Sequence, residues 1–245
     1  MGLVAAERIR RANVDGAEVL EIDGLVLALA NLSDPALSSV VVEREPHDAD
    51  GSLRAAEAEF MRRGLQFGVD VQVGRHQSVD VAIRSAGLAC IIERPGMTID
   101  PRELPDSPLP IGVEIREVAG PDDAEALVQV GVLAFGDDPE VGRAFYGASA
   151  SGGFPDARMF VAWRDGEPVG ISAAYLDGET TGVMGVGVVP LARHEGLGSA
   201  LTVQAARGFP GADLAWLHPS DEALSMYEQL GFERVSDWEV WTRQP

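Results

Sequence analysis

The chain has 245 residues, 46% of them hydrophobic and 24% charged, a balance typical of a globular protein and unlike a disordered one. Its net charge is −20 and it contains no lysine, so we expect no nucleic-acid partner, because phosphates require a basic surface. Its apolar runs are too short to cross a membrane, and one cysteine, Cys90, excludes an internal disulfide. These features predict a cytoplasmic protein, and the acidity is compatible with a cationic small-molecule substrate.

The first hundred residues predict a unit that begins with three strands. Residues 18–43 contain three apolar runs separated by turns, and Asp23-Gly24 favours a tight hairpin between the first two. An acidic stretch with one glycine, residues 43–60, leads into a helix. Residues 95–110 contain five prolines and read as a linker. We therefore expect a first domain at 1–100, a linker at 101–110 and a second domain at 111–245.

The second half predicts a mixture of strands and helices. A helix is expected to begin at Pro121, because a proline followed by two aspartates is typical of a helix start. The other expected elements are a strand at 111–118, a weaker helix at 138–148, three strands within 158–188, a helix after Gly198, a strand at 212–218, a helix at 220–231 and a closing strand or hairpin at 232–243. Strands with interspersed helices indicate an α+β domain with a mostly antiparallel sheet.

The two halves follow the same pattern, which favours a duplicated unit. Asp23-Gly24 and Asp165-Gly166 lie 142 residues apart, and Gly87 and Gly231, each near the end of a predicted helix, lie 144 apart. The halves differ after the third strand. The first half has the acidic stretch, whereas the second has Val188–Leu201, "VVPLARHEGLGSAL". An anion would be repelled at the first position and accepted at the second.

The stretch Val188–Leu201 places an arginine and two glycines where a strand gives way to a helix. The N–H groups of a helix's first turn lack intrahelical partners and carry the positive end of the helix dipole. Because Gly196 and Gly198 permit close approach of the backbone, the site suits a phosphate or diphosphate. Pro190 is expected to end the strand's hydrogen bonding and to open its edge for an extended amide ligand.

This stretch resembles the acyl-CoA-binding motif of the GNAT acyltransferase superfamily, whose core is Arg/Gln-x-x-Gly-x-Gly/Ala; here Arg193, Gly196 and Gly198 match. A second motif, "HPSDEALSMYEQLGFE", is similar to the family's later helix, in which a tyrosine, here Tyr227, is followed by Leu-Gly-Phe. Ser220 departs from the asparagine of many members, and this puts one CoA contact in doubt.

The resemblance covers about 111–243, while the first half resembles a degenerate copy with Ile83 where Tyr227 falls. It implies the GNAT fold, duplicated, and an N-acetyltransferase that moves an acetyl group from acetyl-CoA directly to an amine.

The resemblance also implies roles for individual residues. Tyr227 would give a proton to the departing thiolate, and the N–H of Val188 would hold the thioester oxygen. The acyl-CoA-binding residues would be Val186, Gly187 and Val188, whose backbone holds the pantetheine arm, and Arg193, His194, Glu195, Gly196, Leu197, Gly198 and Ser199, whose N–H groups cradle the diphosphate.

The general base is left open among His218, Glu179 and water, since no glutamate stands on the strand before the loop. The acceptor is expected to be a small cationic amine, for which Asp137, Asp138 and Glu140 are candidate contacts in a cleft between the halves. No metal is expected, because the histidines and Cys90 are scattered. The alternative function is a non-catalytic acyl-CoA sensor or interaction module. Aminoacyl transfer from tRNA is disfavoured by the charge of −20.

Overall fold

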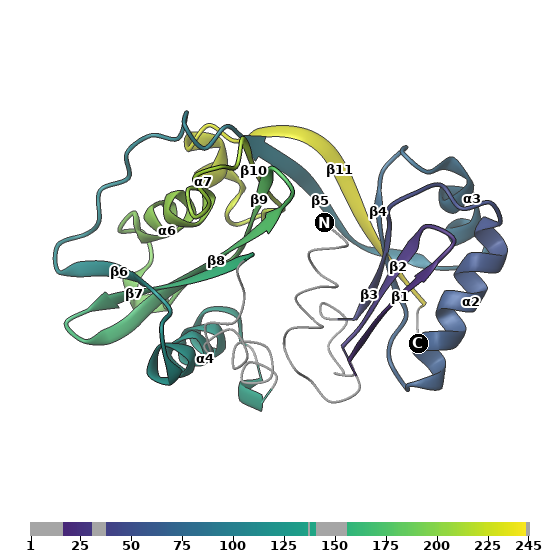
Figure 1. Cartoon of the computed structure of the whole chain (residues 1–245), viewed down its shortest axis with the longest axis horizontal. Helices are drawn as coiled ribbons and strands as arrows, with labels where there is room; N and C mark the ends of the chain where they lie inside the picture. The colour runs from purple at the N-terminus through teal and green to yellow at the C-terminus, as the bar shows by residue number, and fades with distance from the viewer. Residues whose placement is uncertain (1–16, 31–37, 137, 141–155, 244–245) are drawn as a thin grey trace. The chain divides into compact units, whose positions relative to one another are not determined.

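The computed structural model describes residues 17–30, 38–136, 138–140 and 156–243 (Figure 1). The chain forms two compact units, one of Met1–Gly96 with Arg234–Pro245 and one of Met97–Glu233. Among the helices of the described residues, none has both the length and the apolar character that a membrane crossing requires. Asp137 and most of the weaker helix expected at 138–148 lie outside the described residues.

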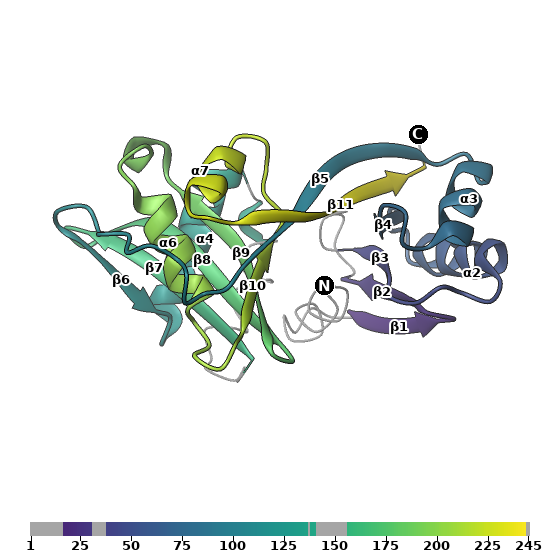
Figure 2. The same cartoon turned by 90° about the horizontal axis from the view of Figure 1, so that it is seen from above.

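In the described residues, the first unit has five strands and the first part of β5 beside β11, and two helices cover this sheet. Its strand order is β1-β2-β3-β4-β11, and β3 and β4 are parallel while the other pairs are antiparallel. The helices α2 and α3 lie side by side (Figure 2) and bury Phe60 and Ile83 against the sheet. The elements are β1 (Glu18–Ile22), β2 (Leu25–Leu29), β3 (Ser39–Val42), α2 (Ala49–Arg62), β4 (Gly68–Gln72), α3 (Gln77–Ser85), the first part of β5 (Ala89–Ile99) and most of β11 (Glu233–Thr242).

The second unit is a sheet of strand order β5-β10-β9-β8-β7-β6, in which β9 and β10 are parallel and the other pairs antiparallel. Helices α6 and α7 lie on one face and α4 on the other (Figure 1). The elements are β6 (Val113–Glu117), α4 (Pro121–Phe135), β7 (Ala157–Arg164), β8 (Glu167–Asp177), β9 (Thr180–Val188), the 3-10 turn η2 (Pro190–Ala192), α6 (Leu197–Ala206), β10 (Leu214–Leu217) and α7 (Leu224–Gln229).

Glycines fix the distance of the helices from this sheet. A Cβ on Gly170 of β8 would come within 2.7 Å of Leu201 of α6, and a Cβ on Gly187 of β9 within 2.6 Å of Phe135 of α4. The two helices therefore pack on opposite faces at positions where a side chain would not fit. We call these the α6 face and the α4 face of the sheet.

The structure confirms the duplication. Both units run through three antiparallel strands, a helix, a strand parallel to the third, and a second helix. Both first hairpins turn at Asp-Gly with matching backbone angles, φ 46° and 90° at Asp23-Gly24 and φ 52° and 86° at Asp165-Gly166, as a type I′ turn requires. In each copy, the strand that follows the second helix pairs with a strand of the other copy. β5 follows α3 and pairs with β10, and β11 follows α7 and pairs with β4.

Part of the proline-rich segment is packed on the second unit. Leu104 is buried in its core, and Arg207 of the same unit donates to the carbonyl oxygens of Pro101 at 3.2 Å and Leu104 at 2.6 Å. The second unit therefore includes this segment and begins at Met97.

Candidate functional site

The edge of β9 opens toward its C-terminal end. Parallel pairing with β10 joins Thr180–Gly182 to Leu214–Trp216 and ends there. On the other side, the register with β8 shifts so that β9 has one extra residue, and Gly185 within this bulge has φ +59°. A bulge bends and twists a strand, so β9 separates from β10 beyond Gly182. The opening expected from Pro190 therefore begins earlier, and its cause is the bulge at Gly185.

The direction of the backbone at Val188 follows from the register. Val188 lies opposite Gly170 of β8, and the N–H of Val189 donates to the carbonyl of Val169 at 3.0 Å. This pattern makes Val188 and Gly170 a non-hydrogen-bonded pair, so the N–H and C=O of Val188 point away from β8 toward the open edge. The carbonyl accepts from Nε of Arg193 at 3.1 Å. The N–H of Val188 faces the opening.

The loop after β9 is held by the Arg193 side chain. Its guanidinium donates to the carbonyls of Val188 and of Ala134 in the last turn of α4, each at 3.1 Å. A cation at a helix C-terminus is favourable, since the carbonyl ends carry partial negative charge. The side chain of Arg193 therefore joins β9, the loop and α4.

The N-terminus of α6 follows two residues with positive φ. His194 at φ +64° and Gly196 at φ +83° turn the backbone into the helix, and among the described residues no side chain caps the helix at Gly196. The N–H groups of Leu197, Gly198 and Ser199 belong to the first turn, where N–H groups have no intrahelical acceptor. His194 and Glu195 are exposed, and the Glu195 carboxylate pairs with Arg164.

Tyr227 lies beside the second turn of α6. Its side chain is buried, packs edge-on against Phe232 with ring centroids 5.7 Å apart, and hydrogen-bonds Thr202. Since the Thr202 hydroxyl donates its proton to the carbonyl of Gly198 at 2.9 Å, the Tyr227 hydroxyl is the donor of that bond. Burial raises the pKa of Tyr227 to about 12, so the phenol is protonated at neutral pH. The phenol lies on the α6 face of the sheet.

The corresponding position of the first unit is filled by the protein's own carboxylates. Asp48 caps α2 by accepting from the N–H of Gly51 at 2.9 Å. Asp23, from the Asp-Gly turn, accepts from the N–H of His47 at 2.7 Å, the N–H of Asp48 at 3.2 Å and the hydroxyl of Ser52 at 3.2 Å. The hydrogen bond between Asp23 and the imidazole of His47 at 2.7 Å, followed by that from the N–H of Asp48, lowers the pKa of Asp23 to about 2. The first copy thus supplies its own anion where the second is open.

The candidate bases lie at different places in the second unit. Glu179 is exposed in the turn before β9, and the nine residue steps from Glu179 to Val188 place it about 30 Å from Val188 at ~3.3 Å per residue. His218 follows β10 directly and is partly buried, with its ring edge-on to Trp216 at a centroid distance of 6.2 Å. His218 is therefore the ionisable candidate beside the opening between β9 and β10.

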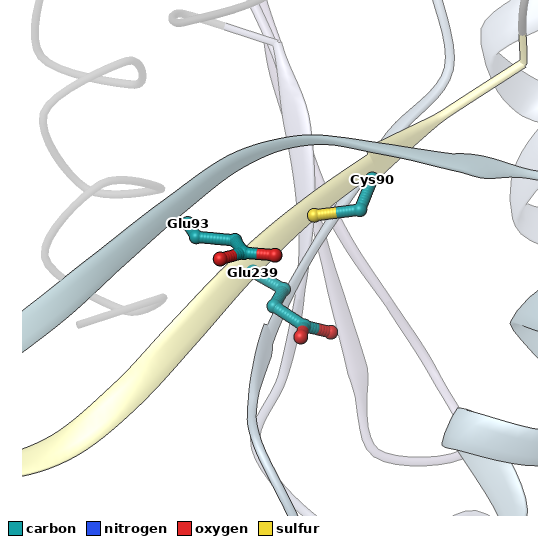
Figure 3. A group of neighbouring side chains, drawn as sticks. All are labelled: Cys90, Glu93 and Glu239. Carbon is teal, nitrogen blue, oxygen red and sulfur yellow. The ribbon is translucent and has the colours of Figure 1, made fainter.

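One group of metal-ligating side chains lies in the first unit (Figure 3). The ligand atoms of Cys90, Glu93 and Glu239 are within 4.8 Å of one another. Burial raises the pKa of Cys90, and both glutamates raise it further. Glu239 accepts from Nε1 of Trp241 at 2.9 Å, and the thiol donates to the carbonyl of Ile92 at 3.4 Å. The protonated thiol disfavours a metal here, because metals bind the thiolate.

Known proteins are similar to this chain over its second unit and over most of its length. A family model, the acetyltransferase (GNAT) domain, matches residues 155–234. A mycothiol acetyltransferase of Rhodococcus erythropolis is 30% identical over 247 residues, which are 88% of this chain and 80% of the relative. The chain belongs to the GNAT acetyltransferase superfamily. It is an N-acetyltransferase that uses acetyl-CoA, the donor of GNAT acetyltransferases.

Other GNAT relatives cover most of the chain. A mycothiol acetyltransferase of Streptomyces griseus is 30% identical over 92% of this chain and 80% of its own length. The structure of a GCN5-related N-acetyltransferase from Kribbella flavida matches 100% of this chain and 97% of its own, with a TM-score of 0.76 and 23% identity. A tandem GNAT protein from the clavulanic acid biosynthesis pathway matches 90% of this chain and 79% of its own at a TM-score of 0.62 and 16% identity. The tandem GNAT fold predicted from the sequence is confirmed.

The structure also shows what sequence reasoning missed. Three features depend on contacts between segments that are distant in sequence. They are the bulge at Gly185, the hydrogen bonds by which Arg193 joins β9 to α4, and the hydrogen bonds that Asp23 accepts near the start of α2. The "MGVGVV" run was a usable signal for the bulge, because a glycine inside a strand often marks one.

Proposed function

We propose that the second unit holds acetyl-CoA along the open edge of β9, with its diphosphate at the N-terminus of α6, and transfers the acetyl group to a small amine. The observation that carries this proposal is the contrast between the copies. The first turn of α6 begins at Gly196 without a side-chain cap, whereas Asp23 and Asp48 fill the same position at α2. A helix N-terminus with free N–H groups favours a phosphate.

The chain's groups are arranged for direct transfer. The amine nitrogen attacks the thioester carbon and the oxygen gains negative charge, which an N–H at the open edge stabilises. Val188 is our candidate for this donor because the register directs its N–H into the opening. As the carbon–sulfur bond breaks, Tyr227 gives its proton to the thiolate. The amine's proton passes to His218 or to water.

A small cationic amine is the acceptor we propose, on the net charge of −20. The relatives from Rhodococcus erythropolis and Streptomyces griseus are named mycothiol acetyltransferases, which makes a thiol-bearing amine of the mycothiol type a second acceptor to test. A thiol-bearing acceptor reacts with thiol reagents just as released CoA does. Transfer is therefore measured as the acetylated amine by mass spectrometry.

The deciding experiment mixes the purified full chain with acetyl-CoA and each amine, and measures acetyl-CoA binding separately by calorimetry. We expect binding to the wild type and an acetylated product with at least one small amine. Gly198→Glu places a negative side chain at the first turn of α6 and should abolish binding. Binding without transfer to any amine would instead establish the acyl-CoA sensor, and unchanged affinity in Gly198→Glu would refute the diphosphate site.

A further inference from the structure

A chain of buried hydrogen bonds links the proposed acid to the backbone of α6. Thr202, in the second turn of α6, is fully buried, and Tyr227 of α7 is 7% exposed. The Thr202 hydroxyl donates to the carbonyl of Gly198 at 2.9 Å, and the Tyr227 hydroxyl donates to Thr202. Each hydroxyl in this chain therefore donates in the same direction, from the phenol toward the start of α6.

Packing between α6 and α7 fixes the two oxygen atoms. Both helices lie on the same face of the sheet (Figure 1), and a Cβ on Gly198 would lie 3.1 Å from Sδ of Met226, the residue before Tyr227. On its other side the ring of Tyr227 packs edge-on against Phe232. The oxygens are thus held in place, while each hydroxyl hydrogen is free to rotate about its carbon–oxygen bond.

This direction of donation does not suit the product of proton transfer. Once Tyr227 has given its proton to the thiolate, its oxygen is a phenolate, which accepts hydrogen bonds and donates none. In the present direction Thr202 would offer that phenolate a lone pair. Rotation of the Thr202 O–H from the carbonyl of Gly198 toward the phenolate offers it a hydrogen instead.

The carbonyl of Gly198 keeps a partner when this rotation occurs. Within α6, it is also the helical acceptor of the backbone N–H of Thr202, four residues later. The rotation therefore leaves no buried carbonyl unsatisfied, which would be costly. A hydrogen bond to a charged oxygen is also stronger than one between neutral groups, so formation of the phenolate favours the rotated hydroxyl.

The phenol needs this help because its surroundings are apolar. Burial raises the pKa of Tyr227 to about 12, whereas a free thiol has a pKa of ~8.5. Transfer of the proton to the thiolate therefore depends on a group that stabilises the phenolate. The hydrogen bond with Thr202 opposes the effect of burial and lowers the pKa of Tyr227.

We infer that Thr202 is a positioning residue for the acid, which accepts a hydrogen bond from the phenol before proton transfer and donates one to the phenolate after it. The transferred proton moves from the Tyr227 oxygen to sulfur as the carbon–sulfur bond breaks. Thr202 keeps its own proton throughout, and the phenolate regains a proton from water after CoA leaves. This inference rests on the proposed function, in which Tyr227 is the acid.

The test compares two acetyl donors that differ in the leaving atom. Acetyl-CoA releases a thiolate, whereas its selenoester analogue releases a selenolate, a weaker base that leaves without taking up a proton. With acetyl-CoA, Thr202→Val should lower kcat about tenfold and leave the KM for acetyl-CoA within about twofold. With the selenoester, kcat of Thr202→Val should stay within about threefold of the wild type, because no phenolate forms. Thr202→Ser keeps the hydroxyl and should restore most of kcat with acetyl-CoA.

Thr181→Val is the matched control. Thr181 lies in the part of β9 that pairs with β10 and is also fully buried, and its hydroxyl has no hydrogen-bond partner among the described residues. The same exchange of a hydroxyl for a methyl group should therefore leave kcat with both donors within about twofold of the wild type.

Three results would overturn the inference while the wild type still forms the acetylated amine, which leaves the proposed function standing. They are an equal loss of kcat with both donors in Thr202→Val, no loss with acetyl-CoA in that variant, and a Thr202→Ser variant as slow as Thr202→Val. If the wild type acetylates no amine with either donor, the proposed function is refuted and the inference falls with it.

Discussion

Replacing Tyr227 by phenylalanine tests the proposed acid while leaving the packing of the ring in place. The change removes one hydroxyl and its bond to Thr202, worth about 0.5–1.5 kcal/mol of unfolding free energy. A positioned proton donor contributes about 10²–10⁴-fold to a rate. A hundredfold loss of kcat corresponds to about 2.7 kcal/mol of activation free energy. We therefore expect a drop in kcat that is much larger than the loss of stability can explain.

The assay measures kcat, KM for acetyl-CoA and the urea midpoint for the wild type, Tyr227→Phe and Thr202→Val. Thr202→Val keeps the phenol and removes its partner, so it should lose comparable stability with a smaller loss of kcat. A kcat in Tyr227→Phe within about threefold of the wild type would refute the role of the phenol, since one general acid contributes at least ~10²-fold.

The raised pKa of Tyr227 adds an independent readout at high pH. Its folded value of about 12 lies above its usual value of 10, so the folded state retains a proton that the unfolded state loses. The stability that the buried phenol contributes is fully present below pH 10 and is lost as the pH rises toward 12, by roughly 2.7 kcal/mol at ~1.36 kcal/mol per unit. Tyr227→Phe should lack this part of the alkaline loss, and an identical alkaline limb in both proteins would contradict the buried, protonated phenol.

Three further outcomes follow from the contacts. Calorimetry should give one acetyl-CoA per chain, because Asp23 fills the position in the first copy that corresponds to the diphosphate site. The folded pKa of Asp23, about 2, is below the usual 3.8. Asp23→Ala should therefore lower the melting temperature at pH 7, and should lower it less as the pH falls toward 2. Burial raises the pKa of Asp70 to about 6 despite Arg94, so the unfolding free energy should fall as the pH rises from 4 to 6, and Asp70→Asn should lack this fall in urea titrations. Arg193→Leu loses bonds to the carbonyls of Val188 and Ala134 and should raise KM for acetyl-CoA by about tenfold, with partial rescue in Arg193→Lys.

Local chemistry made much of the fold predictable. The two Asp-Gly pairs specify type I′ turns whatever surrounds them, so both hairpins and the duplication were readable from the sequence. The helix at Pro121 was predicted at its observed first residue, because proline and two aspartates satisfy the first turn. The loop from Arg193 to Gly198 was recognisable because glycine adopts backbone conformations that other residues avoid, and Gly196 indeed has positive φ.

Other features depend on what each segment meets in space. β5 pairs with β10 of the second unit, and β11 pairs with β4 of the first unit. These strands are of similar composition, and no local propensity encodes which partner each of them takes. The side chain of Arg193 donates hydrogen bonds to carbonyls 5 and 59 residues away. A sequence motif describes only adjacent positions, so it did not predict this structural role of Arg193. Likewise, Asp23 was readable as a turn residue, but its acceptance of three hydrogen bonds at α2 requires the turn and the helix to meet.

The divergence of the two copies has one physical origin, the anion at a helix N-terminus. Every such terminus needs acceptors for its first N–H groups. The first copy satisfies this need with Asp48, which accepts from the N–H of Gly51, while Asp23 accepts from the N–H groups of His47 and Asp48 just before the helix, and so it gains stability and loses a ligand site. We propose that the second copy leaves the first turn of α6 to an external anion, beside a strand whose edge the bulge at Gly185 has opened. A carboxylate introduced at Gly198 would return the second copy toward the first in charge, but its Cβ would lie 3.1 Å from Sδ of Met226, so acetyl-CoA binding should be lost without a gain in stability.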